Sequence, residues 1–173
     1  MCRKYIPFAH ASSVFDIDIS FFRKYEINTI LIDLDNTLDS YKTKLPSQRA
    51  IDFKEKMEEN GIVLIVTSNN TGKRVSLYSN ALGVKYWSSV GKPFGKKLCK
   101  LMKENGIDKN HVILIGDQTT TDIMCANNAH IKSVLTDKIV KEDQPTTRFN
   151  RLIDIPMRKH LNKKGLLIDW RDR

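Results

Sequence analysis

Cysteine, histidine and long apolar runs are scarce in this 173-residue chain, and the scarcity of each argues against particular classes of protein. The three cysteines (Cys2, Cys99 and Cys125) are odd in number and widely spaced, so they predict reduced thiols rather than a disulfide framework or a metal site. The four histidines are equally scattered. No apolar run approaches the ~20 residues that span a bilayer, and the N-terminal segment lacks the apolar stretch of a secretory signal. We therefore expect a cytoplasmic protein without a transmembrane segment.

Acidic residues are also in short supply: 20 Asp and Glu oppose 29 Lys and Arg, which gives a net charge of +9. The excess lies in the second half of the chain. Residues 87–173 hold 17 basic and 10 acidic residues, whereas residues 1–86 hold 12 and 10. A basic surface of this kind suits nucleic acid, an anionic membrane surface or a phosphorylated substrate. A lysine-rich surface that only keeps the protein soluble is the alternative.

Five short apolar runs predict strands, at residues 29–34, 62–66, 84–87, 112–116 and 131–135. Continuous rather than alternating apolar character fits strands that are buried on both faces of a parallel sheet. Helix-like segments separate these runs, at residues 47–60, 71–82, 93–105 and 120–129. The alternation predicts an α/β fold, a doubly wound, Rossmann-like parallel sheet of about five strands.

No repeat, low-complexity stretch or linker divides the sequence, so we expect a single domain over 1–173 with its core at about 27–135. The basic segment 137–173 should pack on this core or extend from it. Within it, RFNRLIDIPMRKHL resembles an amphipathic helix that we expect to break near Pro156. Its apolar residues Phe149, Leu152, Ile153 and Leu161 could cover the sheet or a partner, and covering the sheet edge is favoured over membrane binding.

Two acids, Asp33 and Asp35, stand at the end of the apolar run ILIDLDNTL. Residues i and i+2 of a strand point to the same face, so both carboxylates would crowd together. Buried like charges are tolerated mainly when a cation lies between them or when one of them carries a proton. An ordinary turn that closes a strand is the alternative.

Polar residues follow the other predicted strands as well. Thr67-Ser68-Asn69-Asn70 follows the second strand, Gly91-Lys92-Pro93 precedes the third long helix, and Gly116-Asp117 begins a run that ends at Asp122. Ligands of open α/β sheets gather beyond the carboxyl ends of the strands. Carboxylates and carbonyls there suit Mg²⁺, and a hydroxyl, helix N-terminal amides and a lysine suit phosphate.

Taken in order, DLDNTL, SNN, KP and GDQTTTD resemble the four motifs of haloacid dehalogenase (HAD)-type phosphohydrolases. The resemblance covers residues ~27 to 135. The FDID segment before the first motif and the basic RFNR segment after the core are similar to the YqeG branch of the class IIIA phosphatases, which includes phosphatidylglycerophosphate phosphatases.

The resemblance implies a role for each motif residue. Asp33 would be the nucleophile that forms an aspartyl-phosphate, and Asp35 the general acid and then the base. Ser68, Asn69 and Lys92 would bind the phosphoryl oxygens or position them, with Thr37 a weaker candidate. Mg²⁺ would be held by the Asp33 side chain, the Asp35 backbone carbonyl and Asp117, and supported by Asp122. In this family a small or apolar residue usually stands at the position of Asp39, which could therefore alter substrate approach or be an exposed acid without a role.

The spacing between motifs leaves no room for a cap domain. Residues 39–61 and 71–91 each suffice for about one helix and its loops. An open site suits a phosphate on something large, and we expect phosphatidylglycerophosphate, a lipid head group, at an anionic membrane surface, with the protein cytoplasmic or peripheral at the membrane. A phosphatase for nucleic-acid ends or a phosphoprotein, and a non-catalytic binding module, are the alternatives. A response-regulator receiver domain is excluded, because VKYWSSVG lacks the phosphoacceptor aspartate after the third strand.

Overall fold

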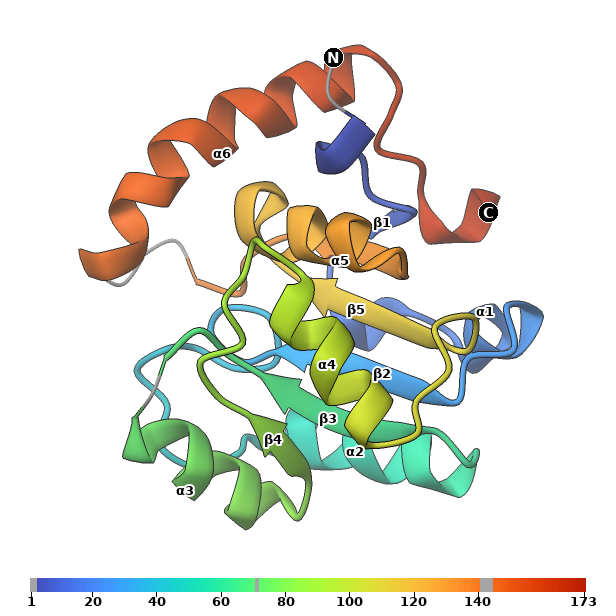
Figure 1. The fold of residues 1–173 in the computed structure, drawn as a ribbon, viewed down its shortest axis with the longest axis vertical. Helices are drawn as coiled ribbons and strands as arrows, with labels where there is room; N and C mark the ends of the chain where they lie inside the picture. Colours follow the sequence, from blue (N-terminus) through green and yellow to red (C-terminus); the bar gives the residue numbers. More distant parts are fainter. Residues whose placement is uncertain (1–2, 71, 141–144) are drawn as a thin grey trace.

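The computed structural model describes residues 3–70, 72–140 and 145–173, with the side chains of residues 145–151 outside the description. The predicted doubly wound sheet is confirmed: six parallel strands lie in the order β1-β6-β5-β2-β3-β4, with helices on both faces (Figure 1). The strands are β1 (Ala9–Ala11), β2 (Thr29–Asp33), β3 (Val63–Thr67), β4 (Lys85–Trp87), β5 (Val112–Gly116) and β6 (Lys132–Thr136).

The α-helices that accompany the strands in the described part of the chain are α1 (Ile19–Lys24), α2 (Gln48–Glu59), α3 (Lys73–Leu82), α4 (Lys96–Glu104), α5 (Met124–Ala129) and α6 (Pro145–Lys163). A π-helical turn, η3 (Thr119–Ile123), precedes α5, and three 3₁₀ turns lie at η1 (Arg3–Tyr5), η2 (Val14–Asp16) and η4 (Trp170–Asp172). Ser47 caps the N-terminus of α2, since its side chain accepts a hydrogen bond from the Ala50 amide.

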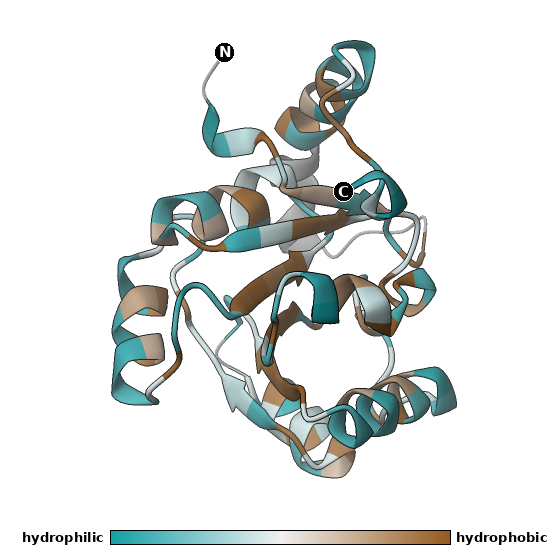
Figure 2. Ribbon diagram, turned by 90° about the vertical axis from the view of Figure 1, so that its right-hand side faces the viewer, coloured by the Kyte–Doolittle hydropathy of each residue, from teal (hydrophilic) through white to brown (hydrophobic). Residues whose placement is uncertain are grey.

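The sheet is buried on both faces, as continuous apolar strands require. Alternate residues of β2 point into two separate cores: Ile30 and Ile32 pack with α1, α2 and α3, whereas Leu31 packs with α4 and α5. Figure 2 shows apolar colour along the central strands and mixed colour on the helices around them. The apolar strands therefore form a central layer between two layers of helices, and this packing fixes the positions of the strand ends.

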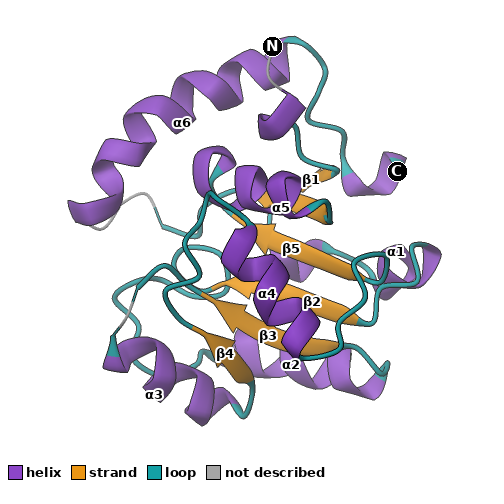
Figure 3. Ribbon diagram, viewed as in Figure 1, coloured by secondary structure: helices purple, strands orange, loops and turns teal. Residues whose placement is uncertain are grey.

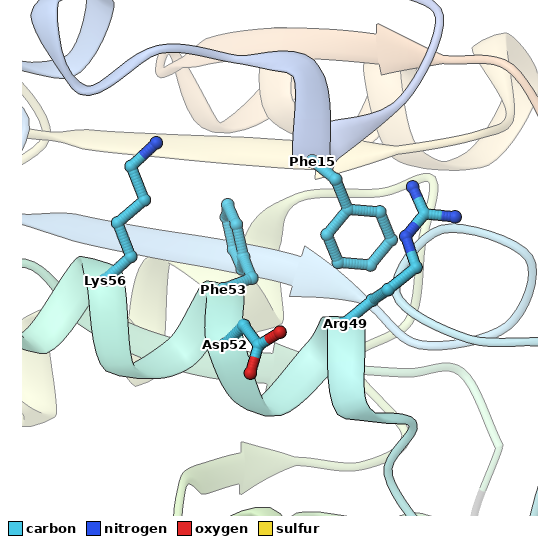
Figure 4. A pocket seen from close by; sticks show the side chains of 5 residues that line it. All are labelled: Phe15, Arg49, Asp52, Phe53 and Lys56. Atoms are coloured by element: carbon cyan, nitrogen blue, oxygen red, sulfur yellow. The ribbon is translucent and has the colours of Figure 1, made fainter.

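The N-terminal segment adds β1, η2 and α1, which the sequence did not predict. β1 is a three-residue edge strand that pairs with β6. Further along, Phe15 of η2 packs edge-to-face on Phe53 of α2, with ring centroids 5.8 Å apart, and the Arg49 guanidinium lies 4.4 Å from the Phe15 ring centroid. These side chains line a hollow of about 220 Å³ (Figure 4) that contains none of the predicted site residues. The segment thus covers α2.

The C-terminal helix corrects one prediction, because α6 runs unbroken through Pro156. A proline removes one helical hydrogen bond, to the carbonyl four residues earlier. Pro156 is exposed, and Leu152, whose carbonyl loses that bond, has a 71% exposed side chain, so water can take the bond over. Leu161 is buried as expected, but Leu152 and Ile153 are exposed rather than packed, and the predicted packing of Phe149 lies outside the described side chains. No helix in the described ranges is long and apolar enough to cross a bilayer.

Candidate active site

The predicted site residues lie beyond the carboxyl ends of β2, β3 and β5, which are neighbours in the sheet. Asp33 ends β2 in register with Thr67, which ends β3. Asp117 follows directly after β5, and the loops beyond these strand ends gather at one edge of the molecule (Figure 3). The fold therefore brings residues 33, 67 and 117 together although they are far apart in sequence.

Lys92 joins two of the predicted acids. Its ammonium nitrogen lies 2.8 Å from Asp33 Oδ1 and 2.7 Å from Asp122 Oδ1, and it also donates to the Thr67 carbonyl at 3.1 Å. Only 2% of the Lys92 side chain is exposed. Burial opposes its charge, but Asp122 and Asp33 outweigh burial and raise the pKa of Lys92 above its ordinary value. Lys92 is therefore a buried, permanently charged cation beside Asp33.

The pKa of Asp33 is raised well above its ordinary value. Burial is the largest cause; Lys92 lowers the pKa, and the carboxylates of Asp122, Asp117 and Asp35 raise it. Four carboxylates therefore lie close together at this edge. Among the described side chains, Lys92 pairs with Asp33 and Asp122, and Arg74 pairs with Asp35. Carboxylates repel a phosphate dianion, so a bound cation would assist the binding of phosphate here.

This raised pKa predicts how stability depends on pH in the absence of metal. The folded protein holds the Asp33 proton more tightly than the unfolded chain does. The stabilisation of the folded state by this proton is therefore complete below the pKa of Asp33 in the unfolded chain, about 3.9. It is lost as the pH rises through the higher pKa of Asp33 in the folded protein. With EDTA present, Asp33→Asn should accordingly gain stability relative to the wild type as the pH rises from about 4 to about 7. Urea unfolding at a series of pH values measures this, with the exposed Glu59→Gln as control; a difference that does not vary with pH would contradict it.

Asp35 faces a different partner, Arg74 of α3, which the sequence did not predict. The Arg74 guanidinium donates to Asp35 Oδ1 and, at 2.9 Å, to the Ser40 carbonyl. The side-chain amide of Asn70 donates to the other oxygen of Asp35, Oδ2, at 3.1 Å. These contacts fix the direction of the Asp35 carboxylate. An arginine shortly after the SNN motif was the available signal.

Ser68 and Asn69 lie beside Lys92, in the loop after β3. Ser68 is 3% exposed, and its hydroxyl accepts a hydrogen bond from the backbone amide of Asn70 at 3.0 Å. Asn69 bonds reciprocally with the Lys92 backbone: its Oδ1 accepts from the Lys92 amide at 2.8 Å, and its Nδ2 donates to the Lys92 carbonyl at 2.9 Å. Asn69 therefore positions the Lys92 loop. The hydroxyl of Thr37 is buried and has no hydrogen-bond partner within the described part of the chain.

Gly116 makes room for Asp122. A Cβ atom at position 116 would lie 2.3 Å from Asp122 Cγ, far inside van der Waals contact. Asp122 can therefore rest against the end of β5, where its Oδ2 accepts from the Gln118 amide at 3.2 Å and its Oδ1 accepts from Lys92. In this arrangement Asp122 contacts the lysine directly. Its predicted support of a metal stays a prediction.

Gly116→Ala should displace Asp122 and with it Lys92. If Lys92 binds the phosphoryl oxygens, as the family resemblance implies, kcat/KM for a phosphomonoester should fall by about 10²-fold, because a misplacement of ~1 Å at an active site has an effect of this size. Steady-state kinetics with thermal unfolding as a check on folding measure the effect. Gly106→Ala is the control, because its added Cβ meets no atom within 4 Å; its φ of +67° strains this substitution, whereas Gly116 has no such φ. Equal losses of activity in both variants would contradict this account.

Asp39 is buried, so it is not an exposed acid. Its side chain accepts from the Tyr78 hydroxyl at 2.5 Å and from the Ser47 amide at 2.9 Å. Burial and the bond to Asp39 raise the pKa of Tyr78. Asp39 therefore ties the loop after Asp35 to α2 and α3, which gives it a structural role beside the site.

The residues at this edge fit a hard divalent cation. Asp33 and Asp117 offer carboxylate oxygens, and the mutual repulsion of the neighbouring acids, which raises the pKa of Asp33, favours a bound cation. The described ranges contain no group of three His, Cys, Asp or Glu side chains that could hold a metal ion. Backbone carbonyls, water or substrate oxygens would complete the ligand set, as Mg²⁺ sites commonly have it.

Comparison with known proteins places the chain in a family. Residues 89–151 match the family model described as HAD-hydrolase-like. The "Probable phosphatase YqeG" of Bacillus subtilis (strain 168) is 30% identical over 97% of both chains. Two solved structures share the fold: one described as a HAD family hydrolase, from Streptomyces avermitilis MA-4680 (15% identity, TM-score 0.52, 72% of this chain and 73% of that chain), and an uncharacterised protein from Listeria monocytogenes serotype 4b (14%, 0.52, 77% and 99%). The chain belongs to the HAD family of hydrolases, and within it to the phosphatases.

Proposed function

We propose that this protein is a Mg²⁺-dependent phosphomonoesterase that works through an aspartyl-phosphate on Asp33. The observation that carries the proposal is the position of Lys92, buried between Asp33 and Asp122 and within 2.8 Å of each. A structural ion pair needs only one acid, whereas a phosphoryl-transfer site needs a nucleophile next to a fixed cation. Asp35, two residues after Asp33, forms its ion pair with Arg74. The proposed nucleophile and the proposed acid are therefore held by different cations.

In the first step a carboxylate oxygen of Asp33 attacks phosphorus, and the bond from phosphorus to the leaving oxygen breaks. Asp35 gives its proton to that leaving oxygen. In the second step Asp35 takes a proton from water, and the water oxygen displaces the Asp33 carboxylate from phosphorus and releases inorganic phosphate. Lys92 and the Ser68 hydroxyl stabilise the phosphoryl oxygens, where negative charge is concentrated in the transition state.

Mg²⁺ would be held by Asp33, Asp117 and the Asp35 backbone carbonyl, where it would neutralise negative charge and orient the phosphate. The crowding of Asp35, Asp117 and Asp122 around Asp33, which raises the pKa of Asp33, supports this role. Asp122 serves the site by fixing Lys92, and its part in supporting the metal remains within the proposal.

The proposed substrate is a phosphate carried by a large or membrane-borne molecule, such as phosphatidylglycerophosphate. Residues 34–62 form only loops and α2, and residues 72–84 form little besides α3, so no domain within the described ranges covers the site. The basic second half of the chain supports an anionic surface as the place of action, with the protein peripheral at the membrane. Phosphorylated nucleic-acid ends or a phosphoprotein are the competing substrates.

The test is inorganic phosphate release from phosphatidylglycerophosphate in mixed micelles, with Mg²⁺ or with EDTA. A 3′- or 5′-phosphorylated oligonucleotide and p-nitrophenyl phosphate are assayed alongside. Mg²⁺-dependent release that is fastest from the lipid is the expected result. Release from p-nitrophenyl phosphate but not from the lipid would retain the chemistry and overturn the lipid substrate, and preference for the oligonucleotide would transfer the proposal to nucleic-acid ends. Absence of release from all three would indicate a binding role.

A further inference from the structure

The C-terminal helix α6 lies outside all four motifs and still reaches the loop that carries Asp117. Asp154, whose side chain is 1% exposed, accepts a hydrogen bond from the Thr119 amide at 2.6 Å and another from the Thr119 hydroxyl. Thr119 stands two residues after Asp117 and begins η3. A carboxylate of α6 therefore caps the turn that follows the predicted metal ligand.

Arg158, one helical turn after Asp154, bonds to the same loop. Its Nη2 donates to the Asp117 backbone carbonyl at 2.7 Å and also to the Thr136 carbonyl at the end of β6. Its Nη1 donates to Asp137 at 2.9 Å, and its Nε lies 3.3 Å from Asp154 Oδ2. One guanidinium thus joins the ends of β5 and β6 to α6.

The charged contacts of Asp154 and Arg158 are specific to the Asp117 loop, and they are not the contacts expected if α6 only had to be attached to the core. Taking an ion pair out of water has a desolvation cost, which apolar side chains on the same helix face would avoid. Leu161, about two turns after Asp154 on α6, is such an apolar side chain, and it is fully buried. At positions 154 and 158 the chain instead uses charged groups, and each bonds to the backbone within two residues of Asp117.

We propose that Asp154 and Arg158 are positioning residues that hold the Asp117 loop in the geometry needed to bind the cation. The proposal rests on the proposed function, because it takes Asp117 to be a metal ligand. Neither side chain needs to touch the cation or the substrate. Groups that orient metal ligands change metal affinity by about 10- to 100-fold when they are replaced.

The test compares full-length wild type with Asp154→Ala, Asp154→Asn, Arg158→Ala and Leu161→Ala. Isothermal titration with Mn²⁺, used as a probe for the divalent cation, gives the affinity. Amide hydrogen exchange over residues 117–123, measured without metal, reports the loop itself. Leu161→Ala is the matched control, because it weakens the packing of α6 about 4.5 Å along the helix from Arg158 and about 10 Å from Asp154, without removing a bond to the loop.

We expect both Asp154→Ala and Arg158→Ala to weaken Mn²⁺ binding by about 10-fold or more and to speed exchange in the loop. Asp154→Asn keeps an oxygen that can accept from Thr119, so it should recover part of the affinity. Leu161→Ala should lower the thermal midpoint and leave the Mn²⁺ affinity within about 2-fold of wild type.

Two results would overturn the inference. Wild-type affinity and exchange in Asp154→Ala and Arg158→Ala would remove the positioning role while leaving the proposed phosphatase intact. Losses in Leu161→Ala equal to those of the other variants would mean that α6 acts only through general stability. Phosphate release by the wild type, measured separately, tests the proposed function itself, and failure of the wild type to bind Mn²⁺ would overturn both.

Discussion

Asp33→Asn should abolish phosphate release, with kcat reduced by on the order of 10³-fold or more. An amide cannot form the acyl-phosphate, so every later step is lost with it. The substitution keeps the size of the side chain and an oxygen that can accept from Lys92, whose nitrogen lies 2.8 Å from Asp33 Oδ1. It also removes one of four crowded acids, so the folded protein without metal should be at least as stable as the wild type near neutral pH.

The measurement is phosphate release from p-nitrophenyl phosphate, with urea unfolding of the same preparations. The exposed acid Glu59→Gln serves as the matched loss of one carboxylate. Activity within about tenfold of wild type in Asp33→Asn would exclude Asp33 as the nucleophile. Loss of both activity and stability would instead indicate that Asp33 is needed to fold the site.

Lys92→Met should have the second largest effect, and it should change stability as well as rate. Methionine has a similar length but no charge, so Asp33 and Asp122 would be left largely buried without their shared cation. Removing one partner of a buried ion pair costs about 3–5 kcal/mol of folding free energy. Loss of a donor to the phosphoryl oxygens should lower kcat by about 10²- to 10³-fold.

A second substitution separates these two effects. Asp122→Asn combined with Lys92→Met removes one of the unpaired charges, so it should recover much of the stability and none of the activity. Lys100→Met is the control, because that side chain is 75% exposed and its loss should change stability by about 0.5 kcal/mol or less. A Lys92→Met protein as stable as this control would show that the buried pair is not needed for folding.

Local patterns were enough to predict the sheet and the motif residues around it. Apolar runs are buried in a parallel sheet whatever surrounds them, and polar residues after such runs must lie at the carboxyl edge. That is why Asp33, Ser68, Lys92 and Asp117 could be placed near one another before the structure was known. β1 was missed because three residues with a histidine at the centre carry too little apolar signal to indicate a strand.

The supports of the site depend on contacts that local patterns do not contain. Arg74 meets Asp35 across 39 residues, and Arg158 meets the Asp117 carbonyl across 41 residues. In sequence both arginines look like ordinary basic residues on helix surfaces. Of the two alternatives for Asp39, the exposed acid is wrong for a related reason, since its partner Tyr78 also lies 39 residues away; an effect on substrate approach stays a prediction. Pro156 was misjudged because an exposed carbonyl can be satisfied by water, which the sequence does not reveal.

The edge strand β1 places a constraint on how the protein is made. It comprises residues 9–11, yet it pairs on one side with residues 134–136 of β6, and on the other side the His10 amide donates to the Ile168 carbonyl at 2.8 Å. β1 therefore waits for about 120 further residues to be synthesised before the backbone groups of either of its edges are paired. At synthesis rates of about 5–20 residues per second that wait is roughly 6–25 s. During that wait the backbone groups of residues 9–11 have no strand to pair with, and this edge of the sheet can form only after residues 134–136 have been synthesised.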